Sequence, residues 1–254
     1  MMPQARLRHR EWQACWLAIG FLTRIPMMIH IDYSQRLMNQ SSMYFPLVGL
    51  LLGCLYVVAF TLFNVIASPL VAVILVTILH LFITGSFHED GLADSVDALG
   101  GGYTVEKRLA IMKDSRIGTY GAVALVMALL LKVILLAEAD DIWLALLVAP
   151  AASRLTPLLI MARLPYVSDP DKSKSRPVAD GFSNRRLMAA ITFVLLLTAA
   201  LSFWHPLLIL SAAVSVLFVA LAWGSYLRSQ LRGYTGDTLG AAVVFSELLL
   251  LLFL

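Results

Sequence analysis

Three aspartates share one short stretch of the chain, Phe87–Leu99. We expect the helix of the preceding apolar run, Leu70–Phe87, to continue through this stretch. Asp90, Asp94 and Asp97 then stand at positions i, i+4 and i+7, which lie within about 60° of one another around the helix. Like charges this close destabilise a helix unless a cation lies among them. Carboxylate oxygens suit Mg²⁺ or Mn²⁺, with substrate phosphates completing the coordination. The spacing predicts a Mg²⁺ site at these three residues, and the alternative is a solvated acidic helix end.

The same stretch contains two candidates for a general base. Asp97 or His88 could receive the proton of an attacking hydroxyl once a phosphate-bearing substrate is held by the metal. A histidine without a chemical role, placed at the edge of a membrane, is the alternative for His88.

A second polar cluster, Lys113–Gly121, precedes an apolar run. Arg116 and the backbone N–H groups of a helix that begins near Gly118 could hold a phosphate, with Asp114 beside them. A charged cap before a membrane helix is the alternative for this cluster.

A third polar cluster, Gly233–Ala241, opens the last apolar run. Gly236 and Gly240 form a GxxxG face, which lets two helices approach closely. Asp237 on this face would meet the other aspartates, and Thr235 lies just before it. Asp237 as a simple helix N-cap is the alternative.

Three ionisable residues lie deep in apolar segments: Lys132, Arg154 and Glu247. Each costs about 2.5–3.5 kcal/mol at the centre of a membrane, so each is expected to face the protein interior. They could bind substrate, with Lys132 and Arg154 as a phosphate clamp. A structural ion pair of Glu247 with Lys132 or Arg154 is the alternative.

The composition indicates an integral membrane protein. Of 254 residues, 60% are hydrophobic and only 14% are charged, which excludes a disordered chain, a secreted disulfide scaffold and a typical cytosolic enzyme. The net charge of +3 and the lack of a basic stripe argue against nucleic-acid binding. Cys15 and Cys54 lie in apolar runs and are expected to be free thiols.

Apolar runs of about 20 residues predict an all-α, polytopic helical bundle in the lipid bilayer. A weaker run, Trp12–Ile29, contains Arg24 and Pro26 and is expected to be an interfacial or re-entrant helix. We expect a single membrane domain over residues 1–254. The seven predicted spans are Met43–Ala67, Leu70–Phe87, Gly118–Ala139, Ile142–Ala162, Leu187–Trp204, Pro206–Leu227 and Leu239–Leu254.

Charge asymmetry predicts the orientation. The loop 163–186 holds six Lys and Arg residues and the loop 88–117 holds four, whereas the links at 68–69, 140–141 and 205 hold none. The positive-inside rule places both long loops in the cytoplasm. The polar clusters then lie at the cytoplasmic ends of the helices, a pattern that favours metal-dependent transfer of a phosphate-bearing group at the membrane surface.

Five motifs together resemble the cobalamin synthase family (adenosylcobinamide-GDP ribazoletransferase). The resemblance runs from about Trp16 to the C-terminus, and the five motifs come in the order that the family has. Lys132, Ser153-Arg154 and Glu247 also fall where the family carries a Lys, a Ser-Arg pair and a Glu. The motifs are Phe21–Pro26, Tyr44–Gly49, Phe87–Asp97, Ile111–Gly121 and Thr235–Ala241.

This resemblance implies an Mg²⁺-dependent membrane enzyme. A hydroxyl of α-ribazole, or of its 5′-phosphate, would attack adenosylcobinamide-GDP, release GMP and form adenosylcobalamin or its phosphate. It implies Asp90, Asp94 and Asp97 as metal ligands, and a substrate site lined by Arg116, Lys132, Arg154 and Asp237. The site would face the cytoplasm from the inner membrane of a prokaryote. The sequence does not decide between a monomer and a homo-oligomer.

Two other functions remain as alternatives. The Asp90-Gly91-x-Ala93 core resembles the CDP-alcohol phosphotransferases, whose motif has an Arg where this chain has Asp94. A cation-coupled transporter could bind its ion at the aspartates and relay protons through Glu247. Transporters favour charges near the midplane and repeated halves, whereas this chain gathers its charges at one face.

Overall fold

The computed structural model describes residues 3–168 and 183–254, with the side chains of residues 3–9 left out. Within these ranges the chain forms twelve α-helices and one 3₁₀ helix, and the only β-type pairing is an isolated bridge between Tyr166 and Tyr234. The predicted all-α fold is confirmed. The helices are α1 (Pro3–Leu22), α2 (Gln35–Ser41), α3 (Phe45–Ile66), α4 (Pro69–Thr84), α5 (Phe87–Gly101), α6 (Val105–Met112), α7 (Thr119–Glu138), α8 (Ile142–Ser153), α9 (Thr156–Met161), α10 (Asn184–Leu201), α11 (Leu208–Leu231) and α12 (Gly236–Leu251), with the 3₁₀ helix Ser42–Tyr44 between α2 and α3.

Five helical segments are long and apolar enough to cross a membrane, and a bent pair, α4 with α5, could add a sixth. This supports a polytopic membrane protein, although it differs from the seven predicted spans. The five segments are Gln35–Ile66, Thr119–Glu138, Ile142–Met161, Asn184–Leu201 and Leu208–Leu231.

The sequence predicts one continuous helix from the span Leu70–Phe87 into the aspartate stretch, and this prediction is wrong. The chain turns by 85° between α4 and α5. Gly85 and Ser86 both adopt the left-handed conformation, with φ of 66° and 56°. Glycine adopts this conformation at little cost, whereas serine does so rarely. Two consecutive left-handed residues end α4 and turn the chain before α5 begins. The aspartates therefore lie on a separate helix, α5.

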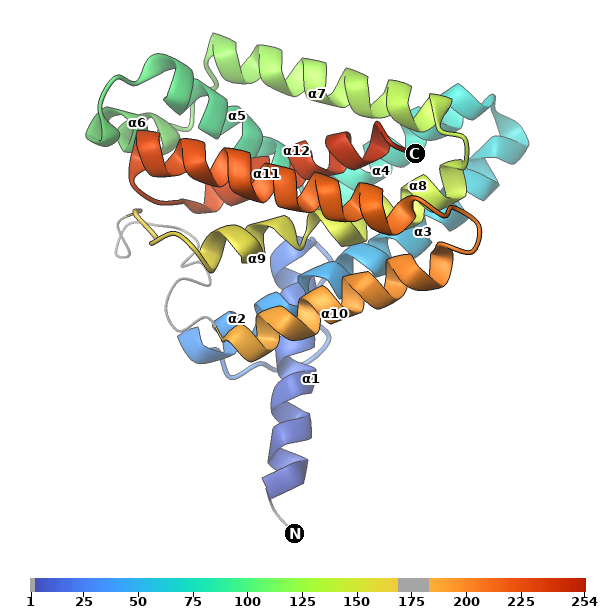
Figure 1. Cartoon of the computed structure of the whole chain (residues 1–254), viewed down its shortest axis with the longest axis horizontal. Coiled ribbons are helices and arrows are strands. Elements are labelled where there is room, and N and C mark those ends of the chain that lie inside the picture. The colour runs from blue at the N-terminus through green and yellow to red at the C-terminus, as the bar shows by residue number, and fades with distance from the viewer. Residues whose placement is uncertain (1–2, 169–182) are drawn as a thin grey trace.

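The predicted span Leu239–Leu254 corresponds to α12, a helix of 16 residues that is not among the candidate spans. It packs against α5, α7, α8, α9 and α11, and most of its residues are buried. In Figure 1 it lies in the middle of the bundle, behind α11. Because protein surrounds this helix, it is apolar on all sides, as a buried helix is.

The predicted span Ile142–Ala162 consists of two helices. α8 ends at Ser153, and α9 begins at Thr156 with Pro157 in its first turn. Proline has no N–H to donate to the preceding turn and its ring clashes there, which explains the break. Arg154 lies in this break.

The long helices run side by side, and their connections fall at two ends of the bundle (Figure 1). One end carries residues 102–118, 162–168 and 232–235, and the other carries the short links 67–68, 139–141 and 202–207. The predicted basic loop 163–186 falls largely on residues 169–182, outside the described residues.

The predicted helix Trp12–Ile29 ends earlier than expected, at Leu22. Pro26 disfavours helical geometry at Ile25. The backbone N–H of Arg24 instead donates to the carbonyl of Ile83 in α4, at 2.7 Å. α1 is not a candidate span, and Figure 1 shows it running across the direction of the long helices.

Candidate active site

Two glycines allow α5 and α12 to cross at close range. A Cβ atom on Gly91 would lie 2.6 Å from the backbone oxygen of Asp237, and one on Gly240 would lie 3.3 Å from the backbone oxygen of His88. Only a residue without a side chain fits at Gly91 without moving the backbone. The close approach predicted from the GxxxG spacing is present at Gly240, and it joins the starts of the two helices.

This crossing brings Asp90, Asp94 and Asp237 into one group, here called the carboxylate group. Asp90 is exposed, whereas Asp94 and Asp237 are partly buried. Burial, followed by the charges of Asp90, Asp237 and Asp97, raises the pKa of Asp94 to about 7. Burial and the charge of Asp90 raise the pKa of Asp237 to about 6. The three carboxylates therefore repel one another, and a cation among them would relieve this repulsion.

The carboxylate group fits a magnesium ion that takes few ligands from the protein. Among the described side chains, no three His, Cys, Asp or Glu stand close enough to hold a metal ion by themselves. Mg²⁺ is usually bound by one or two carboxylates, and water and substrate phosphates complete its octahedral shell. The donor set, with Asp90 open to solvent, matches this mode of binding.

Both carboxylate oxygens of Asp97 are engaged by backbone N–H groups. Its Oδ2 accepts a hydrogen bond from the backbone N–H of Gly118 at 2.7 Å, and its Oδ1 accepts one from Gly121 at 2.8 Å. Both donors lie at the start of α7. Asp97 shares a helix face with Asp94, as the spacing predicts, but its carboxylate holds α7 against α5.

Three other predicted site residues form local structure. Arg116 pairs with Asp114 at 2.6 Å, and the Arg116 side chain is 87% exposed. Hydrogen bonds from Arg116 lower the pKa of Asp114 to about 2. Thr235 is buried and forms a capping box with Thr238 at the start of α12, which fixes the position of Asp237.

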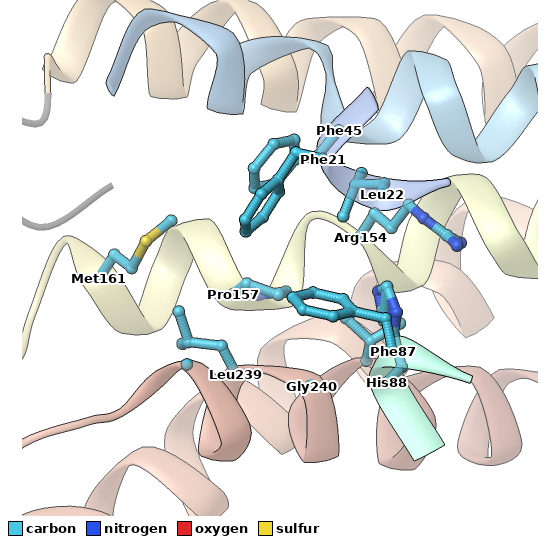
Figure 2. Close-up of a pocket in the computed structure, with 12 residues that line it drawn as sticks. Phe21, Leu22, Phe45, Phe87, His88, Arg154, Pro157, Met161, Leu239 and Gly240 are labelled. Carbon is cyan, nitrogen blue, oxygen red and sulfur yellow. The ribbon is translucent and has the colours of Figure 1, made fainter. Parts of the chain in front are cut away.

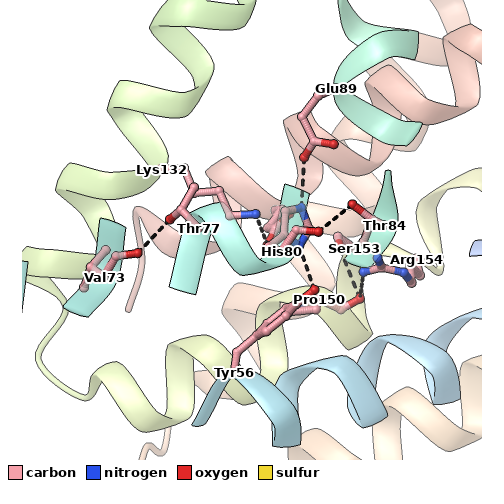
Figure 3. A network of polar contacts seen from close by, with 11 residues as sticks. Tyr56, Val73, Thr77, His80, Thr84, Glu89, Lys132, Pro150, Ser153 and Arg154 are labelled. Carbon is pink, nitrogen blue, oxygen red and sulfur yellow. Dashed lines mark hydrogen bonds and ion pairs between the residues drawn. The ribbon is translucent and has the colours of Figure 1, made fainter. Parts of the chain in front are cut away.

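The deep charges form a buried network (Figure 3). The Lys132 ammonium lies 3.0 Å from the Glu247 carboxylate, and both residues are buried. This is the ion pair that the sequence offered as an alternative to the phosphate clamp. Arg154 is only 1% exposed, and its Nη1 donates to the carbonyl of Pro150 at 2.8 Å. The Nε and Nη2 atoms of Arg154 have no hydrogen-bond partner in the described protein.

The network also contains Tyr56, His80 and Glu89, which no sequence pattern singled out. The Tyr56 hydroxyl lies 2.8 Å from Nδ1 of His80, and Nε2 of His80 lies 2.9 Å from the Glu89 carboxylate (Figure 3). Both His80 and Glu89 are buried. A histidine inside an apolar helix is costly in a membrane, and this was the available signal for His80.

A pocket lies beside the crossing of α5 and α12, and its space of about 520 Å³ includes a part that is open to solvent. Phe21, Phe45 and Phe87 form part of its wall, together with His88 and Arg154, and we call it the phenylalanine pocket (Figure 2). His88 is 4% exposed, and its Nδ1 has no hydrogen-bond partner in the described protein. The pocket shares α5 and α12 with the carboxylate group.

Comparison with known sequences decides the family. The sequence model described as cobalamin-5-phosphate synthase matches residues 14–254. The chain belongs to the cobalamin-5-phosphate synthase family. This confirms the resemblance read from the five motifs and makes the protein a transferase of cobalamin synthesis, acting in assembly of the nucleotide loop.

Members of the family from Vibrio and Shewanella species are similar along almost the whole chain. An adenosylcobinamide-GDP ribazoletransferase of Vibrio parahaemolyticus is 44% identical over 254 residues, which cover 98% of this chain and 94% of the relative. Proteins of the same name from Shewanella pealeana and Vibrio cholerae are 44% and 43% identical, and they cover 92% and 94% of this chain and 91% of each relative. No solved structure matches the chain.

Proposed function

We propose that this protein transfers the cobinamide-bearing phosphoryl group of adenosylcobinamide-GDP to α-ribazole or its 5′-phosphate and releases GMP. The relatives support this proposal because their name specifies both the donor and the ribazole group. The observation that carries it is the crossing of α5 and α12, which gathers Asp90, Asp94 and Asp237 into one group that faces solvent at Asp90. A diphosphate donor with its metal ion is the partner that such a group suits.

In this proposal one or two residues of the carboxylate group, Asp90, Asp94 and Asp237, would hold Mg²⁺ together with phosphate oxygens of the donor, and the ion would neutralise charge on these oxygens. Asp97 contributes indirectly, since it fixes the start of α7 against α5. Arg116 is exposed in the connection between α6 and α7, where an anionic substrate can reach it. Thr235 and Asp114 then act as supports for Asp237 and Arg116 respectively.

The transfer itself exchanges one phosphorus–oxygen bond for another. The acceptor hydroxyl oxygen bonds to the phosphorus that carries cobinamide, the bond from this phosphorus to GMP breaks, and GMP leaves with the electron pair. The hydroxyl proton passes to a base. His88 and Asp97 are the two candidates for this base. His88 has a ring nitrogen without a hydrogen-bond partner in the described protein, whereas both oxygens of Asp97 accept backbone hydrogen bonds.

We place the site at the cytoplasmic face of a prokaryotic inner membrane. The positive-inside rule supports this orientation, because the end of the bundle with residues 102–118 and 162–168 carries Lys and Arg, whereas the links 67–68, 139–141 and 202–207 at the other end carry none. A GDP conjugate is a cytoplasmic metabolite, which agrees with a site that opens on this side.

The proposal is tested with the purified protein in detergent and Mg²⁺. Adenosylcobinamide-GDP and α-ribazole are expected to yield a cobalamin and GMP. A parallel reaction contains a CDP-alcohol and a lipid acceptor. Release of CMP in that reaction, with no GMP from the cobinamide donor, would instead support a CDP-alcohol phosphotransferase.

A further inference from the structure

The phenylalanine pocket has a distinct arrangement of apolar and polar walls. The rings of Phe21 and Phe45 are stacked with centroids 5.8 Å apart, and Phe87 meets Phe21 edge to face at 5.3 Å. Figure 2 shows Met161 and Leu239 at one end of the pocket and His88 with Arg154 at the other. Flat apolar walls of this kind favour an aromatic ligand.

The polar end has hydrogen-bonding capacity that the described protein does not use. His88 Nδ1 and the Nε and Nη2 atoms of Arg154 are buried and have no partner. Leaving a buried polar group unpaired costs about 1–3 kcal/mol, and more for a charged group. Such groups at one end of an apolar pocket point to a ligand with an apolar body and polar groups at one side.

The two substrates of the proposed function offer three bulky parts that could enter this pocket. The corrinoid is a macrocycle with amide side chains and an adenosyl group, and apolar walls would leave these polar groups unpaired. Guanine carries hydrogen-bonding groups along two edges, which apolar walls would leave unpaired. The base of α-ribazole is a two-ring benzimidazole with two methyl groups, and it is small, flat and largely apolar.

We propose that the phenylalanine pocket binds the dimethylbenzimidazole base of the acceptor nucleoside. The ribose hydroxyls, and the 5′-phosphate where present, then lie at the end formed by His88 and Arg154. This assignment rests on the proposed function, since it names the subsite of one of its two substrates. It gives Arg154 a ligand for the guanidinium nitrogens that the protein leaves unpaired.

The position of the pocket relative to the carboxylate group supports the assignment. His88 lines the pocket and precedes Asp90 by two residues in α5. Gly236 lines the pocket and directly precedes Asp237 in α12. An acceptor bound in the pocket is therefore held next to the helix starts that carry the proposed metal ligands.

Kinetics of pocket variants test this proposal. Phe21→Leu and Phe87→Leu remove one ring each and keep an apolar side chain. We expect them to raise KM for α-ribazole by roughly two- to tenfold and to leave KM for adenosylcobinamide-GDP within twofold. Phe82→Leu is the matched control, because Phe82 lies on the exposed face of α4 and is 76% exposed. A rise in KM for adenosylcobinamide-GDP alone would overturn the proposal.

A series of bases gives a second test with the unaltered protein. Removing the two methyl groups in turn from the benzimidazole nucleoside is expected to weaken its binding by about fourfold for each methyl. Equal affinities for the dimethyl and the unmethylated nucleoside would overturn the proposal.

Direct binding of α-ribazole separates this inference from the proposed function. Equilibrium dialysis against the purified protein without adenosylcobinamide-GDP measures binding without turnover. Weaker binding in Phe21→Leu than in Phe82→Leu supports the subsite even if no GMP is released, in which case only the proposed reaction fails. Turnover with a KM for α-ribazole that is unchanged in Phe21→Leu and Phe87→Leu contradicts the subsite and leaves the reaction standing.

Discussion

Asp97 accepts a hydrogen bond from the backbone N–H of Gly118, with 2.7 Å between Oδ2 and the nitrogen. Its other oxygen accepts one from Gly121 at 2.8 Å. The first N–H groups of a helix have no partner within the helix, and a carboxylate there also interacts favourably with the helix dipole. Asp97 therefore links α5 to the start of α7, the helix that carries Lys132.

We predict that Asp97→Asn lowers the stability of the protein and leaves its Mg²⁺ requirement nearly unchanged. The amide has only one oxygen and presents an NH₂ group to a backbone donor, so a loss of about 1–2 kcal/mol is expected. Thermal unfolding in detergent measures this loss, and activity at varied Mg²⁺ measures the concentration needed for half-activation, which should stay within twofold. An unchanged Tm with a large rise in this concentration would make Asp97 a metal ligand.

Asp90→Asn and Asp237→Asn are expected to have the opposite effect. Each should lower kcat by about 100-fold or more, because a charge that stabilises the reacting complex is lost. Tm should stay constant or rise, since repulsion within the carboxylate group decreases. Asp140→Asn is the matched control, because Asp140 is exposed at the opposite end of the bundle. Activity of the two variants close to that of the control would exclude these ligands.

The buried pair of Lys132 and Glu247 allows a double-mutant test. Lys132→Met leaves a buried carboxylate without its partner and should destabilise the protein by about 3–5 kcal/mol. Adding Glu247→Leu should recover most of this loss, because two apolar side chains replace both charges. Thermal unfolding of the two single variants and the double variant measures the coupling. Losses that simply add would show that the 3.0 Å contact does not stabilise the fold.

The crossing of α5 and α12 is tested by Gly91→Ala. The new Cβ would lie 2.6 Å from the backbone oxygen of Asp237, so the two helices must separate. We expect activity to decrease at least about tenfold and the protein to lose about 1–3 kcal/mol. Gly224→Ala is the matched control in α11, where a Cβ meets nothing within 4 Å. Equal activity in both variants would contradict a site built on this crossing.

Local periodicity was enough to predict several relationships at the site. A single helix carries Asp90, Asp94 and Asp97 on one face, and the GxxxG spacing predicted the close approach at Gly240. The partner of Asp97 could not be predicted, because α7 follows α5 only after a connection and a further short helix. Which way a carboxylate points depends on such tertiary neighbours rather than on helix periodicity.

The turn between α4 and α5 shows a different limit of sequence reasoning. Gly85 permits positive φ without requiring it, and serine at position 86 rarely adopts it, so the sequence predicted a continuous helix here. Hydropathy also could not distinguish α12 from a membrane span, since burial in protein and burial in lipid select the same apolar residues. Arg154 was expected to face inward because of its cost in lipid, whereas its unpaired nitrogens depend on the packing around the break at Pro157.

The most direct test of the proposed reaction is the ratio of GMP released to cobalamin formed by the purified protein. We predict one GMP for each cobalamin, only when adenosylcobinamide-GDP, α-ribazole and Mg²⁺ are all present. Chelation of the metal should abolish both products, and added Mg²⁺ should restore them. Cobalamin formed at the same rate after chelation, or GMP released without α-ribazole, would contradict metal-assisted transfer to the ribazole hydroxyl.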